Sequence, residues 1–204
     1  MNETKTSTAE KASFFSSKLL VLNTVVLITS VGLNVLLAYR VQRQNSAIVA
    51  RRAENTLNVG TAVPPITAMR WGEGRREVIS YGDTSRPTVL YIFTPPCSWC
   101  KRNTDNFNAL VDKKSGEYRF IGLSLSKDGL GEYLTTHHST IPIYTDLSKD
   151  TIAAYKLSGT PQTLVISPAG MVVKNWKGAY TGGQESEVES FFQVKLPGLR
   201  ADSQ

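Results

Sequence analysis

The sequence contains very few residues that could bind a metal ion or build a disulfide framework. Its 204 residues include only two cysteines, Cys97 and Cys100, and only two histidines, His137 and His138. A structural zinc site needs four ligands, and paired histidine ligands usually stand three to five residues apart, so this set argues against zinc. A disulfide between the two cysteines would close a very short loop, remove little entropy from the unfolded chain and therefore stabilise the fold little.

An excess of positive charge is missing from most of the chain, although the net charge of the whole protein is +6. Residues 1–52 contain seven Lys and Arg but only two Asp and Glu. Residues 53–204 contain sixteen Lys and Arg and fifteen Asp and Glu. The basic residues therefore flank an apolar segment, where they favour anionic lipid head groups. The remainder is nearly neutral and gives no electrostatic reason to expect a nucleic-acid partner. The sequence also has no internal repeat and no nucleotide-binding fingerprint.

One long segment has no charged residue at all. It runs from Leu19 to Tyr39, close to the roughly 20 residues that cross a bilayer as a helix. A cleaved signal peptide is the alternative, but its apolar core is usually only about 7–15 residues long and is followed by a small-residue cleavage site, which is not found here. We therefore expect a single, uncleaved anchor in the membrane lipid. Three Lys precede the segment and four Arg follow it, so flanking charge does not settle its orientation.

The two cysteines form a Cys-x-x-Cys motif with Ser98 and Trp99 between them. The run just before it, Thr88–Phe93, is apolar and either β-branched or aromatic, which predicts a buried strand. The run from about Ser98 to Lys113 has helical periodicity. Cys97 is therefore expected at a helix N-terminus, where the helix dipole and free backbone N–H groups favour a thiolate. This arrangement is suited to thiol–disulfide exchange.

The rest of the chain alternates between expected strands and helices. Strands are expected near 77–81, 88–93, 118–125, 142–145, 163–167 and 171–176, and helices near 98–113, 129–138, 149–156 and 184–194. This alternation predicts an α/β fold whose central mixed sheet has helices on both faces. The expected boundaries are a disordered tail at 1–13, an anchor and juxtamembrane helix at 14–52 with its span at about 19–39, a linker at 53–66, the α/β domain at 67–195 and a tail at 196–204.

Four segments carry a resemblance to a known family. They are VGTAVPPI at 59–66, TPPCSWCK at 94–101, GTPQTLVI at 159–166, and PAGMVV at 168–173 followed by Gly178. Together they resemble the thioredoxin superfamily, in particular its membrane-anchored TlpA-like branch. The resemblance covers roughly Val59 to Phe192. It implies a thioredoxin-like three-layer fold preceded by one N-terminal transmembrane helix.

The resemblance implies a role for each cysteine and for the loop at 159–161. Cys97 would be the exposed, attacking sulfur, and Cys100 the more buried sulfur that resolves the mixed disulfide. Pro161 would follow a cis peptide bond and pack beside the sulfurs. The backbone of Thr160 would then pair with an extended segment of a protein substrate.

Ser98 and Trp99 are expected to bind substrate. For Trp99 two interpretations remain open: it belongs to an apolar collar that contacts partner proteins, or it folds back onto its own domain. Four positions depart from the family pattern. Tyr91 and Asn103 stand where relatives have a carboxylate, Asp105 stands where they have a proline, and Pro96 stands where they commonly have a Trp. Asp105 is either a substitute acid or, as we favour, a solvated charge on a helix face.

The resemblance implies a membrane-tethered thiol–disulfide oxidoreductase that acts on extracytoplasmic proteins. Its only redox group would be the Cys97–Cys100 disulfide, with no added cofactor or metal, and a membrane protein would supply or accept electrons. We favour a reductase, as in relatives that serve cytochrome c maturation. We place the chain in the bacterial inner (cytoplasmic) membrane with the domain facing the periplasm, where disulfides persist.

Three other functions remain open. The first is a disulfide-forming oxidant. The second is a peroxiredoxin-like peroxidase, because Thr94-x-x-Cys97 echoes part of that motif, although Leu90 replaces the expected proline. The third is a non-catalytic tethering module.

Overall fold

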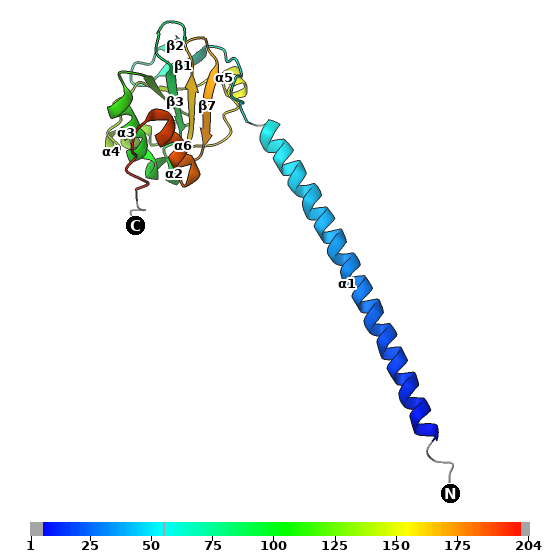
Figure 1. The fold of residues 1–204 in the computed structure, drawn as a ribbon. Helices are drawn as coiled ribbons and strands as arrows, with labels where there is room; N and C mark the ends of the chain where they lie inside the picture. The colour runs from blue at the N-terminus through cyan, green and yellow to red at the C-terminus, as the bar shows by residue number, and fades with distance from the viewer. Residues whose placement is uncertain (1–5, 55, 201–204) are drawn as a thin grey trace. The chain divides into compact units, whose positions relative to one another are not determined.

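The computed structural model describes residues 6–54 and 56–200, and the chain divides into two units, residues 1–54 and 55–204. The first unit is one long helix, α1 (Thr6–Glu54), drawn in blue to cyan in Figure 1. Within it, Val21–Ser46 is long and apolar enough to cross a membrane, with a mean hydropathy of 2.0. This window overlaps the expected span and extends it toward the C-terminus.

The start of α1 differs from the expected disordered tail at 1–13. Residues 6–13 are helical, and residues 1–5 lie outside the described residues. The polar stretch contains Ala9, Glu10, Lys11 and Ala12, which are all good helix formers. Such residues extend a helix easily once the neighbouring apolar segment has formed its first turns.

The second unit is built on a seven-stranded mixed sheet in the order β2-β1-β5-β4-β3-β6-β7. Neighbours β3–β4 and β4–β5 are parallel, and the other pairs are antiparallel. The strands are β1 (Ile66–Arg70), β2 (Arg76–Ile79), β3 (Thr88–Phe93), β4 (Arg119–Ser124), β5 (Ile143–Thr145), β6 (Gln162–Ile166) and β7 (Val172–Lys177). The helices are α2 (Ser98–Arg102), α3 (Thr104–Lys114), α4 (Leu130–Thr136), α5 (Lys149–Ala154) and α6 (Gly183–Phe192).

Helices cover both faces of this sheet, as the sequence predicts (Figure 1). Side chains of β3 alternate between the two faces because successive residues of a strand point in opposite directions. Tyr91 and Phe93 join an apolar cluster with residues of α2, α3, α4 and α6. Leu90 and Ile92 join the opposite cluster, which includes Tyr155 at the end of α5. All six residues of β3 are buried, so the strand that leads to the cysteines is anchored on both faces.

The segment expected as a linker at 53–66 is largely part of the domain. Leu57 and Val63 join the apolar cluster of Leu90 and Ile92. The backbone N–H of Gly60 donates to the carbonyl of Val172, and that of Val63 donates to the carbonyl of Gly170, both at 2.8 Å. Strand β1, which the sequence analysis did not anticipate, follows directly. The domain thus begins about ten residues earlier than the expected residue 67, because these scattered apolar residues are buried by distant partners.

The expected tail at 196–204 is also docked over its described part. Leu196 is buried. The N–H of Gly198 donates to Asn106 Oδ1 at 2.9 Å, and the N–H of Arg200 donates to the carbonyl of Arg102 at 2.9 Å. The C-terminal segment therefore packs against α2 and α3, and residues 201–204 lie outside the described residues.

Candidate active site

The first cysteine of the motif lies where β3 leads into α2. Cys97 is the N-cap of α2 and is partly exposed. Its Sγ accepts a hydrogen bond from the backbone N–H of Cys100 at 3.1 Å. The backbone at the start of the helix thus provides this sulfur with a hydrogen-bond donor. The sequence prediction for the position of Cys97 is confirmed.

The second sulfur has the opposite environment. Cys100 is fully buried in the cluster that also contains Tyr91, Phe93 and Phe107. Burial, followed by its hydrogen bond with Cys97, raises the pKa of the Cys100 thiol to about 12. Both cysteines are free thiols in this structure. The fold thus separates an accessible sulfur from a hidden, protonated one.

The loop before β6 lies beside the accessible sulfur. The Thr160–Pro161 peptide bond is cis. Cys97 Sγ donates to the Thr160 carbonyl at 3.5 Å, and the hydroxyls of Thr160 and Thr94 are 3.2 Å apart. Residues about sixty positions apart therefore meet at one point, as the resemblance implies.

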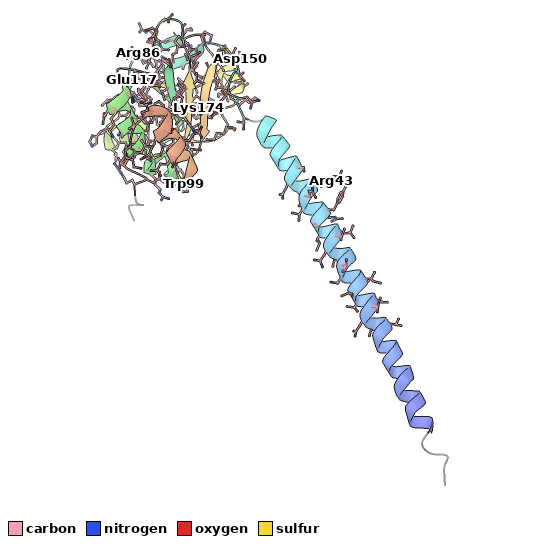
Figure 2. The ribbon with its side chains drawn as sticks, in the orientation of Figure 1. Arg43, Arg86, Trp99, Glu117, Asp150 and Lys174 are labelled. Carbon is pink, nitrogen blue, oxygen red and sulfur yellow. The ribbon has the colours of Figure 1, made fainter. Side chains whose placement is uncertain are left out.

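Trp99 does not fold into the core of its own domain. Its side chain is 48% exposed, and Figure 2 shows it at the edge of the domain. The guanidinium of Arg102 lies over the indole ring, 4.6 Å from the ring centroid. Such a cation–π contact holds an exposed ring in place without hiding its other face. Ser98 is exposed beside it.

A cavity of about 570 Å³ opens next to the motif. Pro96 and Ser98 line it on one side, Glu132 and Tyr133 of α4 on another, and Arg200 of the C-terminal segment completes it. The cavity is therefore formed by three parts of the chain that are distant in sequence. It offers both apolar and charged contacts within reach of Cys97.

The positions that depart from the family pattern have different environments. The Tyr91 hydroxyl and the Nδ2 of Asn103 are both buried without a hydrogen-bond partner. Burial raises the pKa of Tyr91 well above its usual value, and nearby Tyr133 and Cys100 raise it further, whereas the neighbouring Asn103 side chain lowers it although its geometry falls short of a hydrogen bond. Asp105 instead forms an ion pair with Arg200, at 2.9 Å between Oδ2 and Nε, and is partly exposed. This favours the interpretation of Asp105 as a solvated charge.

Asn103 also explains why the expected single helix over 98–113 is two helices. It separates α2 from α3. Its Oδ1 accepts the N–H of Tyr180 at 3.0 Å and the Nδ2 of Asn106 at 3.2 Å. The contact with Tyr180 is long-range, and together with the local one it holds the residue at the junction, three positions after the buried sulfur.

Two buried side chains near the sulfurs were not predicted from the sequence: Tyr133 of α4 and His137, the C-cap of that helix. Tyr133 is buried, its pKa is raised to about 12 mainly by burial, and both sulfurs contribute to that shift. His137 is only 8% exposed, and its Nδ1 has no hydrogen-bond partner. Neither residue belongs to a motif. The only signal available was the rarity of histidine in this chain.

Among the residues that the structure describes, no three His, Cys, Asp or Glu side chains are grouped closely enough to hold a metal ion.

No protein-family model matches the sequence, and no curated protein matches it. Solved structures do match its domain. The thioredoxin domain of a thiol-disulfide oxidoreductase from Bacteroides vulgatus covers 67% of this chain and 99% of its own at 19% identity, with a TM-score of 0.54. StoA from Bacillus subtilis covers 66% and 100% at 19% identity, with a TM-score of 0.52. A thiol:disulfide interchange protein from a Bacteroides species covers 68% and 92% at 18% identity, with a TM-score of 0.52. The fold of the domain is therefore thioredoxin-like.

Proposed function

We propose that this chain is a membrane-tethered thiol–disulfide oxidoreductase that acts on protein substrates. One observation carries the proposal: a partly exposed Cys97 caps a helix, a buried Cys100 lies one turn behind it, and the Thr160–Pro161 loop borders the exposed sulfur. The names of the similar structures, which describe thiol–disulfide exchange proteins, support it. In this proposal the Cys97–Cys100 pair is the only redox group.

The reaction has two steps. The Cys97 thiolate attacks one sulfur of a substrate disulfide, forms a mixed disulfide and releases the other substrate sulfur as a thiolate that takes up a proton. Cys100 then loses its proton and attacks Cys97 Sγ, which forms the Cys97–Cys100 disulfide and releases the second substrate thiol. Two electrons pass from the protein dithiol to the substrate. The hydrogen bond from the Cys100 N–H supports the Cys97 thiolate in the first step.

Substrate contacts would come from the surface around Cys97. The backbone of Thr160 is beside the sulfur and is placed to pair with an extended peptide segment. Ser98 and the exposed ring of Trp99 flank the same sulfur and offer polar and apolar contact. Side chains of the substrate would enter the neighbouring cavity beside Pro96.

The direction of exchange and the location are parts of the same proposal. The apolar helix Val21–Ser46 would anchor the chain once in the bacterial inner membrane. The domain would face the periplasm, where substrate disulfides persist. We propose that it acts as a reductase, with cytochrome c maturation as the process served and a membrane protein as electron donor. This direction rests on the resemblance of the motifs.

A measured reduction potential of the Cys97/Cys100 couple tests both the chemistry and the direction. The full chain in detergent would be equilibrated with glutathione and the two thiols quantified. A potential of about −270 mV would support a reductase. A potential of about −120 mV would mark a disulfide-forming oxidant and overturn the proposed direction of exchange. A Cys97→Ser variant should not reduce insulin, and Cys100→Ser should accumulate the mixed disulfide. Rapid peroxide consumption without exchange would favour a peroxidase instead.

A further inference from the structure

The buried Cys100 thiol must lose its proton during the second step, yet hydroxyl groups surround it where relatives carry an acid. Tyr91 and Tyr133 both interact electrostatically with Cys100. The Thr104 hydroxyl donates to the Cys100 carbonyl at 3.0 Å and lies 3.4 Å from the Tyr133 hydroxyl. A neutral hydroxyl can pass a proton on, but a separate group has to accept it.

A small cavity connects these hydroxyls to His137. It measures about 20 Å³ and is lined by Tyr91, Thr104, Tyr133 and His137, by the polar side chains of Asn108 and Ser139, and by apolar side chains. A cavity needs roughly 10–15 Å³ by this measure to hold one water molecule, and it needs polar partners. This cavity satisfies both requirements.

Two polar atoms of the cavity lining lack the partners that buried groups normally have. These are the Tyr91 hydroxyl and His137 Nδ1, both buried without a hydrogen bond. Buried polar groups are paired with protein or ordered water in the great majority of cases. A single water could serve both atoms at once.

We propose that one water molecule occupies this cavity and that His137 accepts, through it, the proton that Cys100 loses. The inference rests on the proposed function. In the mixed disulfide, the Cys100 thiol donates to the Tyr91 hydroxyl, a contact that the reduced structure does not have, and its proton passes through that hydroxyl and the water to His137 Nδ1, which becomes an imidazolium. The Cys100 thiolate then attacks Cys97 Sγ, and the protein disulfide forms as the substrate thiolate leaves. His137 afterwards gives up a proton to solvent in the larger cavity, which it also lines.

The surroundings of His137 suit a proton acceptor that does not keep the proton. Burial lowers its pKa, so the imidazole is neutral at pH 7 and free to accept. Its ring packs against Tyr133 with centroids 4.5 Å apart. The charged groups that face it come from three other parts of the chain and its own neighbour: Lys101 of α2, Asp105 of α3, Arg200 of the C-terminal segment, and His138. Of these, only Asp105 raises the pKa, and it is paired with Arg200.

The test follows the second step directly. The full chain, reduced and in detergent, would be mixed with the aromatic disulfide dithiobis-nitrobenzoate in a stopped-flow instrument. Cys97 releases the first coloured thiolate, and attack by Cys100 releases the second. In His137→Phe and His137→Asn we expect the second phase at pH 7 to slow by about tenfold or more. We also expect the loss of its inflection at acidic pH, with the first phase unchanged.

His138→Asn is the matched control. His138 is exposed and has a positive φ of 50°, which Asn tolerates, so both phases should match the wild type. A second phase in the His137 variants with the wild-type rate and pH profile would overturn the inference. So would a slowing that is equal at every pH, because it would reveal a merely structural role. If the wild type never released the second thiolate, the proposed function itself would fail.

Discussion

The burial of Cys100 makes a quantitative prediction about alkylation. The perturbation is a pair of variants: Cys97→Ser leaves Cys100 as the only thiol, and Cys100→Ser leaves Cys97. Burial raises the pKa of Cys100 to about 12 from an ordinary value of 9.0. Three pKa units correspond to about 4 kcal/mol against the thiolate. At pH 8 only about one Cys100 in ten thousand would then be ionised, compared with roughly a tenth of thiols that have the ordinary pKa.

Iodoacetamide reacts with thiolates, so its rate reports this fraction. In Cys97→Ser we expect Cys100 to react at least about a thousandfold more slowly at pH 8 than a free cysteine. Because pH 8 is far below its pKa, the rate should still rise about tenfold per pH unit up to pH 10. Cys97 in Cys100→Ser should be modified readily, because it is partly exposed. Mass spectrometry of timed samples would measure both rates.

One result would refute this reasoning. If Cys100 in Cys97→Ser were alkylated as fast as free cysteine, with a rate that levels off near pH 9, the sulfur would not be held in an apolar environment. The removal of Cys97 takes away its hydrogen bond and its electrostatic effect, which both raise the pKa of Cys100, but it leaves burial, the largest cause. An alkylation rate of Cys100 modestly above the predicted one is therefore compatible with the structure, and a rate a thousandfold above it is not.

Four further predictions concern substrate contact and packing. Trp99→Ala should raise the KM for a protein disulfide several-fold and leave the reaction of Cys97 with a small disulfide unchanged, because the ring is exposed beside the sulfur. Leu57→Ala should lower the free energy of unfolding by about 2–4 kcal/mol in urea titrations, since Leu57 is buried; no change would restore the linker interpretation. Asp105→Ala should lower the free energy of unfolding by at most about 1 kcal/mol, because its ion pair with Arg200 is solvated. Truncation of the chain before Leu196 should lower it by about 1.5–3 kcal/mol through the loss of that residue alone.

Local patterns in the sequence were sufficient to predict several elements. The apolar run at 19–39 predicted a helix that could span a membrane, and the structure has one over Val21–Ser46. The β-branched and aromatic run at 88–93 predicted a buried strand, which is β3. Cys97 was expected at a helix N-terminus and is the N-cap of α2. Each of these features depends on neighbours within a few residues, where periodicity and composition carry the information.

The boundaries of the domain depended on distant partners. Leu57 and Val63 look unremarkable in sequence, and they are buried only because strands from elsewhere in the chain complete the cluster around them. Strand β1 forms because β2 and β5 pair with it from both sides. The segment after residue 195 docks through Asn106, which lies about ninety positions earlier.

The candidate site likewise depends partly on local sequence and partly on contacts between distant residues. The sequence by itself determined which sulfurs are available to react, because Cys97 and Cys100 are the only two and their spacing sets them on one helical turn. Only the tertiary structure decided that Thr160 lies beside Cys97 and that Tyr91, Tyr133 and His137 share a cavity near Cys100. These residues belong to four different elements, and no local rule relates them. Their approach is set by the order of strands in the sheet and by the packing of α3 and α4 against it, which also removes Cys100 from water and so fixes its chemistry.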